Sequence, residues 1–293
     1  MTTTGSTGKP VSVRHSELTT FYWAAFTLRD HIWRKRDLAA TFATIRFDSS
    51  ARAAYLSTNP SNLGELLRLS EENGIGFPTL REVQTLSEVL DPALRDECRR
   101  LWGIEIADMY STMETGYITL QCPESENYHV QSECALVEIF DAGGTPCQPG
   151  EIGRVVVTPL HNFAAPLLRY DIGDYAEVGA PCPCGRGLPV LTRIMGRARA
   201  MLTAPNGERS WPLMGGSGFA EIAPVQQYQF VQKIRRRIEA RLVVERPLST
   251  EEENGLRQRM LSRLGHPFEI KLSYVKRIER QAGEKYEEFK SEI

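Results

Sequence analysis

The sequence predicts an α/β protein of two parts, and three features of the chain carry this prediction. Up to about Gly116, amphipathic helices alternate with short apolar strands, which is typical of a mostly parallel sheet with helices packed on it. Short strands separated by Gly- and Pro-containing turns follow, and they predict an antiparallel β subdomain. Beyond Gly196, strands on either side of one helix predict a small α+β lobe.

The first part opens with an amphipathic helix between Ser16 and Arg36, because its apolar residues recur at three- and four-residue spacing. The elements expected next are a helix over 61–73 that ends at Gly74, a strand at 82–85, a helix begun by Asp91-Pro92, and a strand at 105–110. This alternation favours parallel pairing of the strands.

The later segments are shorter and richer in turns. Strands are expected at 117–120, 135–140, 154–158 and 167–170, and in the last lobe at 226–232, 238–244 and 268–275. The helix of that lobe begins at Ser249-Thr-Glu-Glu252, which has the spacing of a capping box, and ends at Gly265. The predicted domains are therefore residues 1–195 and 196–293.

Composition narrows the class of protein. The 293 residues are 41% hydrophobic and 25% charged, which is typical of a globular chain and excludes disordered and collagen-like proteins. Thirty-five Lys and Arg stand against 37 Asp and Glu, so the net charge of -2 predicts neither a nucleic acid nor a membrane partner, and any phosphate binding must be local. No apolar run approaches the roughly 18 residues of a membrane span, and the start of the chain has no signal-peptide pattern. A cytoplasmic protein is expected.

The N-terminal segment from Thr3 to Pro10 is a candidate phosphate-binding loop. Its glycines permit close backbone approach, while its hydroxyls and Lys9 can surround phosphate oxygens. It is not the Walker pattern, because Pro10 stands where that pattern has Ser or Thr. A flexible Gly/Ser/Thr tail is the alternative.

Further motifs follow in a fixed order along the chain. They are Tyr110-Ser-Thr-Met-Glu114, Leu168-Arg-Tyr170 with Gly173-Asp174, Cys182-Pro-Cys-Gly-Arg186, Gly196-Arg197, and Gly283-Glu-Lys285 continuing to Phe289. Together with the N-terminal loop, this series resembles the adenylate-forming ligases. Within that superfamily the sequence is most similar to phenylacetate-CoA ligases and the capsule-biosynthesis proteins of the CapK type.

The resemblance implies a nucleotide site. It implies that Thr3, Thr4, Gly5, Ser6, Thr7, Gly8 and Lys9 fold over the β- and γ-phosphates of ATP. Tyr110 would stack on adenine within a motif that includes Ser111 and Thr112, and Glu114 would hold Mg²⁺. The adenine pocket would be walled by the segment that contains Ser87 and Glu88, where Ser87 replaces the usual glycine. Asp174 would accept hydrogen bonds from the ribose hydroxyls.

The same resemblance implies roles for two basic residues. Gly196-Arg197 resembles the hinge between the lobes, with Arg197 near the nucleotide. Lys285 resembles the catalytic lysine, whose ammonium bridges the acid's carboxylate and the α-phosphate. A solvated surface lysine among neighbouring acidic residues is the alternative for Lys285.

Cysteines and one histidine form a candidate metal site. Cys122, His129, Cys182 and Cys184 offer three thiolates and an imidazole, a set suited to tetrahedral Zn²⁺. Some relatives carry a similar set, but reduced buried thiols remain the alternative, and Cys134 and Cys147 are possible substitutes as ligands.

Four departures from the family pattern bear on activity. A long segment that precedes the loop in the family is missing, and another, which floors the acyl pocket, is missing between Arg46 and Tyr55. Met113 replaces a hydroxyl residue before Glu114, and Ala200 replaces the hinge carboxylate. Strands left unpaired by the missing segments would favour a homodimer.

The expected function is ligation of a carboxylic acid, with an aryl acid as one candidate, to coenzyme A. ATP would activate the small-molecule acid as an acyl-adenylate on Mg²⁺, and a structural Zn²⁺ would be a further cofactor. The alternative is a truncated, non-catalytic relative that binds nucleotide or another protein. A third interpretation is that the sequence is a fragment of a longer enzyme.

Overall fold

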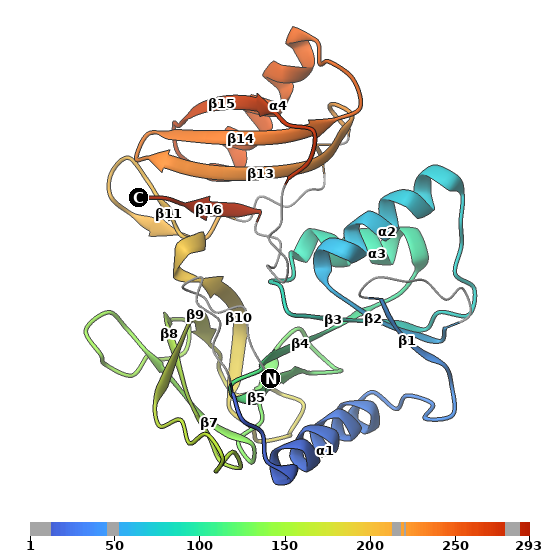
Figure 1. Ribbon diagram of the computed structural model, residues 1–293, viewed down its shortest axis with the longest axis vertical. Coiled ribbons are helices and arrows are strands. Elements are labelled where there is room, and N and C mark those ends of the chain that lie inside the picture. The colour runs from blue at the N-terminus through green and yellow to red at the C-terminus, as the bar shows by residue number, and fades with distance from the viewer. Residues whose placement is uncertain (1–12, 46–52, 213–217, 220, 279–287) are drawn as a thin grey trace. The chain divides into compact units, whose positions relative to one another are not determined.

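The computed structural model describes residues 13–45, 53–212, 218–219, 221–278 and 288–293 (Figure 1). The chain divides into two compact units. The first comprises residues 1–90 and 98–196, and the second comprises residues 91–97 and 197–293. Each unit has its own hydrophobic core, so each is described by itself.

One ten-stranded sheet forms the first unit. Its strands are β1 (Phe42–Ile45), β2 (Tyr55–Thr58), β3 (Glu82–Leu86), β4 (Ile106–Thr112), β5 (Gly116–Gln121), β6 (Tyr128–Val130), β7 (Ala135–Phe140), β8 (Ile152–Pro159), β9 (Tyr170–Val178) and β10 (Val190–Arg197). Their order in the sheet is β1-β2-β3-β4-β5-β6-β10-β9-β8-β7. Strands β1 to β4 are parallel neighbours, while β4-β5-β6-β10 and β7-β8-β9 pair in antiparallel fashion. The antiparallel strands therefore continue the parallel sheet.

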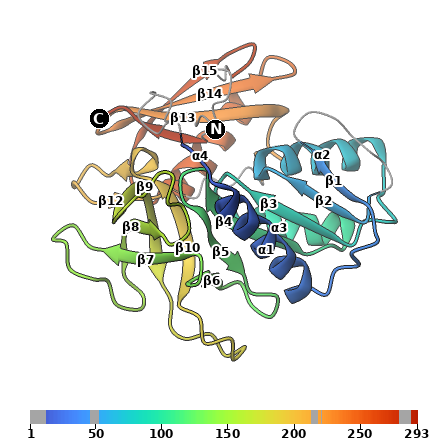
Figure 2. The same cartoon turned by 60° about the horizontal axis from the view of Figure 1, so that its bottom comes forward.

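The first unit contains the helices α1 (Glu17–Trp33) and α2 (Pro60–Asn73), while α3 (Pro92–Trp102) begins in residues of the second unit and ends in residues of the first. Ser16 caps α1 by accepting a hydrogen bond from the Thr19 amide, and α2 ends at Gly74 in the left-handed conformation. Phe26 of α1 packs with Met109 of β4 and with β5 (Figure 2). This packing fixes α1 on the strands that lead into the Tyr110 motif.

A buried charged cluster holds the end of α1 against β3. The Arg36 guanidinium contacts the carboxylates of both Asp30 and Glu82, and Gln84 donates to Asp30 at 2.7 Å. Asp30 and Arg36 are 3% and 7% exposed, so neither charge is solvated by bulk water. Arg34 also pairs with Asp30 and with Glu82, each at 3.3 Å, so loss of Arg36 would leave two buried carboxylates with one guanidinium fewer. That cost makes the cluster specific for one position of α1.

The second unit has a four-stranded sheet in the order β15-β14-β13-β16. Its elements are the short helix η1 (Ala198–Ala200), β11 (Leu202–Thr203), β12 (Arg209–Ser210), β13 (Val225–Ile234), β14 (Arg237–Val244), α4 (Thr250–Leu264), β15 (Glu269–Tyr274) and β16 (Phe289–Ser291). Leu256 and Met260 of α4 pack on Phe230, Ile238 and Leu242 of the sheet. The capping box at Ser249 is present, and Gly265 ends α4 in the left-handed conformation, so both predicted ends of α4 are confirmed.

Two groups of strands differ from expectation. The strand predicted at 167–170 is wrong, because Arg169 has a positive φ of 48° and β9 begins only at Tyr170. The sequence did not predict seven of the strands, namely β1, β2, β6, β10, β11, β12 and β16. Within the part of the chain that the structure describes, no helix combines the length and the apolarity needed to cross a membrane.

Candidate functional site

The predicted nucleotide residues of the first unit gather at the carboxyl ends of neighbouring strands. Ser87 and Glu88 directly follow β3, and Glu114 lies two residues beyond the end of β4. Because β3 and β4 are parallel neighbours, their carboxyl ends lie at the same edge of the sheet. Ligands of α/β proteins bind outside this edge.

A hydrogen bond brings two further predicted residues together. The Tyr110 hydroxyl of β4 donates to Oδ2 of Asp174, on β9, at 2.8 Å. These strands are not neighbours in the sheet, so the antiparallel half must curve to bring them into contact. Asp174 is only 7% exposed, and the hydroxyl supplies one of the partners that a buried carboxylate needs.

The turn that carries Glu114 is stabilised by its own side chains. The Thr112 hydroxyl oxygen accepts a hydrogen bond from the Thr115 amide at 3.1 Å, and the two threonine hydroxyls are 2.9 Å apart. Glu114 is half-buried, while Met113 is 37% exposed. An irregularity in the β4–β5 register between Tyr110 and Ser111 reorients the side chains just before this turn.

Ser87 adopts the left-handed conformation, with φ of 73°. The resemblance predicted glycine at this position, and the backbone indeed has a geometry that favours glycine. Next to it, the Glu88 carboxylate accepts hydrogen bonds from the amide of Ser61 at 2.9 Å and from its hydroxyl at 3.1 Å. Glu88 therefore caps α2, whose Asn59 makes no capping hydrogen bond with its side chain.

Sequence reasoning missed a buried carboxylate under this edge. Asp108 of β4 accepts hydrogen bonds from the Thr85 hydroxyl at 2.6 Å and from the Tyr128 hydroxyl at 2.8 Å. Its backbone N–H donates to the Gln121 side chain at 2.8 Å. Asp108 thus joins β3, β4, β5 and β6 beneath the candidate nucleotide site. The only signal in the sequence was a carboxylate among the apolar residues at the start of β4.

Several predicted residues cannot be placed with this group. Eight of them lie outside the described residues, namely Thr3, Thr4, Gly5, Ser6, Thr7, Gly8, Lys9 and Lys285. Arg197 is the last residue of β10 and belongs to the second unit, where its carbonyl accepts a hydrogen bond from the Trp211 indole at 3.2 Å. Gly196 beside it has φ of 80°.

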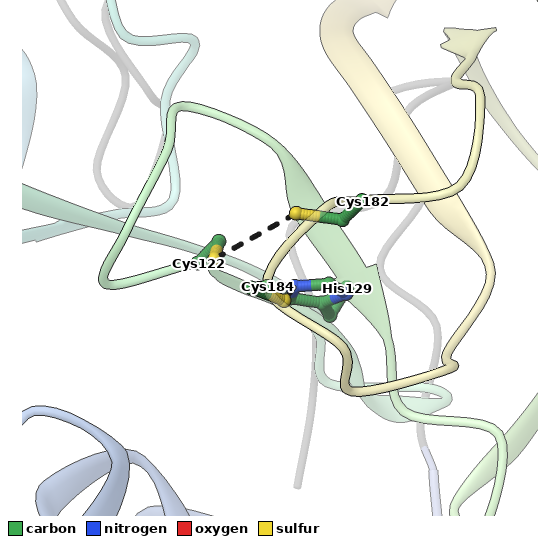
Figure 3. Close-up of side chains that lie close together, drawn as sticks. All are labelled: Cys122, His129, Cys182 and Cys184. Atoms are coloured by element: carbon green, nitrogen blue, oxygen red, sulfur yellow. Dashed lines mark hydrogen bonds between the residues drawn. The ribbon is translucent and has the colours of Figure 1, made fainter.

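The four predicted metal ligands lie together in the first unit (Figure 3). Cys122 follows β5, His129 lies on β6, and Cys182 and Cys184 lie in the loop between β9 and β10. The pairing of Val190 on β10 with His129 brings the two sequence regions together. The potential ligand atoms all lie within 4.8 Å of one another.

The geometry of this cluster fits a tetrahedral zinc ion. The Sγ atoms of Cys122 and Cys182 are 3.9 Å apart, and Sγ of Cys184 is 3.2 Å from Nε2 of His129. A tetrahedral ion with Zn–S bonds of about 2.3 Å holds its sulfurs about 3.8 Å apart. Three sulfurs and one nitrogen form a closed set, which is typical of a structural site.

Local electrostatics favour the ligand forms of two of these residues. Burial, together with the charge of Arg186, lowers the pKa of His129, and the neutral imidazole is the form that binds metal. For Cys182, burial acts to raise the pKa, but hydrogen bonds from the Asn127 side chain and the Cys184 backbone lower it to about 6. Burial raises the pKa of Cys122, a penalty that a bound cation would offset.

Arg186 forms part of the surroundings of the cluster and was not among the predicted site residues. Its guanidinium lies 3.7 Å from Sγ of Cys122, 3.0 Å from the Glu124 carboxylate and 5.0 Å from the centre of the Trp33 ring. The Trp33 ring in turn meets the His129 ring edge to face, with centroids 5.8 Å apart. Arg186 therefore connects the cluster to the end of α1.

The remaining cysteines lie elsewhere. Cys134 is buried in the core with Phe26 and Tyr117, and Cys147 packs against the core of the antiparallel strands. Cys98 is fully buried on α3. None of the three belongs to the cluster of four, so neither proposed substitute ligand replaces a member of it.

Comparisons with known proteins identify the fold. The family model of the CapK C-terminal domain matches residues 217–292. The solved structures that resemble the chain include three CoA ligases or synthetases. They are the anthranilate CoA ligase AuaEII in complex with anthranoyl-AMP (TM-score 0.72, 15% identity, 96% of this chain and 64% of that one), a 2-hydroxyisobutyryl-CoA ligase with R3-HIB-AMP (0.67, 19%, 82% and 55%), and the o-succinylbenzoate CoA synthetase MenE of Bacillus subtilis with OSB-AMP (0.66, 18%, 97% and 66%). The chain has the adenylate-forming ligase fold.

Two known proteins are similar to the chain in sequence. A phenylacetate-coenzyme A ligase of Thermus thermophilus is 28% identical over 140 residues, which are 47% of this chain and 26% of that protein. An uncharacterized acyl-CoA ligase, YhfT, of Bacillus subtilis (strain 168) is 33% identical over 66 residues, 21% of this chain and 14% of that protein. The matches thus span well under two thirds of either relative. Together with the CapK model and the solved structures, these matches confirm the resemblance to adenylate-forming, phenylacetate-CoA ligase-like and CapK proteins.

Proposed function

We propose that this chain is an ATP-dependent ligase that joins a small carboxylic acid to coenzyme A. A carboxylate oxygen of the acid attacks the α-phosphorus of ATP, the α–β phosphoanhydride bond breaks, and pyrophosphate leaves. The thiol sulfur of coenzyme A then attacks the acyl carbon, the thiol proton is lost, and AMP leaves. Both steps depend chiefly on positioning and on neutralisation of phosphate charge.

The observation that carries the proposal is the hydrogen bond between Tyr110 and Asp174. It orients a buried carboxylate in the same group as the turn of Glu114, at the edge where β3 and β4 end. A carboxylate can accept hydrogen bonds from two adjacent ribose hydroxyls at once, which a neutral side chain does less well. The similarity to ligases whose structures contain acyl-AMP supports the same interpretation.

Each residue then has a role in the proposal. Asp174 binds ribose, Tyr110 holds Asp174 and offers its ring to adenine, and Glu114 holds Mg²⁺, which would neutralise phosphate charge. Residues 87–88 wall the base, and Ser111 and Thr112 face the nucleotide. Three further roles rest on the sequence resemblance alone. The Thr3–Lys9 loop would bind phosphates, Arg197 would lie at the hinge, and Lys285 would be the catalytic lysine.

The proposal also covers domains, metal, compartment and assembly. We assign residues 1–195 to an adenylation core and 196–293 to a mobile lobe, a division supported by the boundary of the compact units between residues 196 and 197. The Cys122, His129, Cys182 and Cys184 cluster would hold a structural zinc that fixes two loops. We also propose, from the sequence, that the protein is located in the cytoplasm and forms a homodimer.

A pyrophosphate-release assay tests the reaction. The full chain is incubated with ATP, Mg²⁺ and a panel of aryl and short-chain acids, and pyrophosphate is measured before and after addition of coenzyme A. We expect pyrophosphate release that depends on one acid. We also expect a thioester that forms only after coenzyme A is added. Absence of release with every acid, alongside measurable AMP binding, would favour the non-catalytic relative instead.

Variants separate the two main roles. Asp174→Asn should weaken AMP binding roughly tenfold, because a charge-assisted hydrogen bond contributes about 1.5 to 3 kcal/mol. Asp171→Asn is the matched control on the same strand, since Asp171 pairs with Arg154 instead. Lys285→Ala should abolish pyrophosphate release while AMP affinity stays nearly intact, with Lys290→Ala as its control. Equal loss of release and of AMP affinity would contradict the role of Lys285.

A further inference from the structure

Helix α1 is apolar on two faces. One face carries Trp23 and Phe26, which pack with Met109 and Tyr117 in the core of the first unit. The other face is exposed, and Figure 2 shows α1 at the front of that unit with no other described helix or strand over it. A helix that is apolar all round is normally buried on all sides. The exposed face of α1 is therefore suited to a partner surface.

The exposed face is made by one stripe of side chains, which we call the outer stripe. Its members follow one another at spacings of three, four, three and four residues, and they are Leu18, Phe21, Ala25, Leu28 and Ile32. The four large side chains are 42%, 67%, 46% and 61% exposed. This is the heptad spacing of a coiled-coil seam, which is narrower than the stripe that a helix packs on a sheet. The spacing therefore favours another helix as the partner.

The outer stripe is nearly symmetric about its middle residue, Ala25. Leu18 and Ile32 lie seven residues before and after Ala25, while Phe21 and Leu28 lie four before and three after it. Two copies that cross antiparallel at Ala25 would therefore place Leu18 beside Ile32 and Phe21 beside Leu28. A two-fold dimer needs such a self-complementary surface. The small side chain of Ala25 would let the two helices approach closely at the centre.

Charges at the two ends of α1 favour the antiparallel arrangement. Glu17 lies in the first turn, while His31 lies in the last turn and Lys35 just beyond it. Glu17 and Lys35 are exposed, and neither forms an ion pair within the described part of the chain. An antiparallel copy would bring each Glu17 toward the other Lys35, and it would oppose the two helix dipoles. A parallel copy would bring like charges together.

Exposed apolar residues lie near the start of α1. The Tyr22 ring stacks on the His161 ring with centroids 3.5 Å apart, and the Thr19 hydroxyl donates to the His161 carbonyl at 3.3 Å. The same loop carries Phe163 and Leu168, which are 74% and 80% exposed. These contacts hold an apolar loop beside the first turns of α1.

A second exposed apolar pair lies near the end of α1. Phe42 of β1 meets the His31 ring edge to face, with centroids 5.4 Å apart, and Phe42 and Leu38 are 37% and 66% exposed. An antiparallel copy would bring this pair toward the loop of Phe163. The added surface is needed because a helix of 17 residues is only about 25 Å long, whereas a stable dimer buries about 800 Å² per partner.

We infer that the outer stripe pairs α1 with α1 of a second copy of this chain, antiparallel and across a two-fold axis at Ala25. The inference rests on the homodimer of the proposed function, to which it assigns a named helix, and it does not depend on the ligase reaction. A membrane surface suits the outer stripe less well. Membrane-binding helices border their apolar face with Lys and Arg, whereas Glu17, Thr20 and Ala24 border the outer stripe along one side.

Sedimentation velocity on the full chain tests the pairing. The unmodified chain should sediment as a dimer that dissociates on dilution. Phe21→Glu combined with Leu28→Glu should raise the dimer dissociation constant at least tenfold, because carboxylates would have to lose their hydration in the apolar contact. Ile75→Glu is the matched control, since Ile75 is another apolar residue of the first unit, 51% exposed and outside α1. All the substituted side chains are exposed, so folding should be preserved, and circular dichroism checks it.

Ala25→Cys tests the position of the two-fold axis. The two introduced thiols would face each other, and diamide, which takes up their two electrons and two protons, should join the copies through one disulfide bond. Thr20→Cys is the control, because the antiparallel pair would hold its two thiols about 15 Å apart along the helices. Non-reducing electrophoresis should show the covalent dimer at least tenfold faster in Ala25→Cys than in Thr20→Cys. The unmodified chain gives the background from its own cysteines.

Three results would overturn the inference. They are a monomer at every concentration, an unchanged dissociation constant in the double variant, and equal rates of cross-linking in the two cysteine variants. Binding of phosphatidylcholine vesicles by a monomeric chain would assign the outer stripe to a membrane surface instead. Failure of the ligase reaction is a separate result. If no acid gives pyrophosphate release while the dimer forms as described, the ligase proposal fails and the α1 interface remains.

Discussion

Ser87 carries a backbone conformation that costs energy for any residue with a Cβ atom. Its φ of 73° lies in the left-handed region, which costs roughly 1 to 2 kcal/mol for such residues. Glycine removes this cost but gains unfolded-state entropy of roughly 0.5 to 1 kcal/mol. We therefore expect Ser87→Gly to stabilise the first unit by roughly 0.5 to 1 kcal/mol in urea unfolding. Ser132→Gly, at an exposed position without positive φ, should destabilise it instead, and the same sign for both would contradict this explanation.

Gly196 is required for two reasons at the end of β10. Its φ is 80°, and a Cβ atom there would lie 2.7 Å from Cγ2 of Val89. Gly196→Ala should therefore destabilise the first unit by about 2 kcal/mol, the sum of backbone strain and overpacking. Val89→Ala removes the clash and is itself mild, because Val89 is 43% exposed. Equilibrium unfolding of the double variant should recover about half of the loss. No recovery would mean that backbone strain alone accounts for it.

The four candidate metal ligands could be predicted as one set, but not the strand pairing that brings them together. Cys182 and Cys184 are close in sequence, whereas Cys122 and His129 lie about fifty residues upstream, and only the β6–β10 pairing brings the pairs together. That pairing was not predicted, because neither the three-residue strand β6 nor β10 was predicted from the sequence. Arg186 and Asp108 were missed for the same reason, since their roles depend on partners from distant strands.

Elements with strong local signals were predicted well. In the helices α1, α2 and α4, apolar residues recur with helical spacing and the capping residues lie next to the helix in sequence. The capping box at Ser249 is one such signal. The short parallel strands β1 and β2 lack such a signal, because a four-residue strand buried in a sheet has no periodicity to detect. The continuity of the ten-stranded sheet likewise depends on pairing between segments that no local pattern specifies.

The loops that carry the candidate metal ligands are joined to α1 through Arg186. Its guanidinium is within 3.7 Å of the Cys122 sulfur, where a three-thiolate zinc centre would carry excess negative charge. Arg186→Gln should therefore lower zinc affinity about tenfold, measured by competition with a chromophoric chelator. Arg193→Gln is the control, because Arg193 pairs with Glu177 away from the cluster and should leave affinity unchanged. Equal affinity in Arg186→Gln and the unmodified chain would exclude this role.

The two compact units predict how the whole chain unfolds. Ile118 belongs to the core of the first unit and Met260 to the core of the second, and both are fully buried. Units with separate cores tend to unfold separately, so calorimetry of the full chain should show two transitions. Ile118→Ala and Met260→Ala each cost about 2 to 5 kcal/mol, and each should lower one transition by several degrees without moving the other.

Zinc removal assigns the transitions independently of any core variant. The candidate ligands all belong to the first unit, and a metal that binds only the folded state stabilises the unit that holds it. A chelator should therefore lower the transition that Ile118→Ala lowers and leave the one that Met260→Ala lowers unchanged. A single transition that shifts with every change would show that the units unfold as one, and the proposed independence of the C-terminal lobe would then fail.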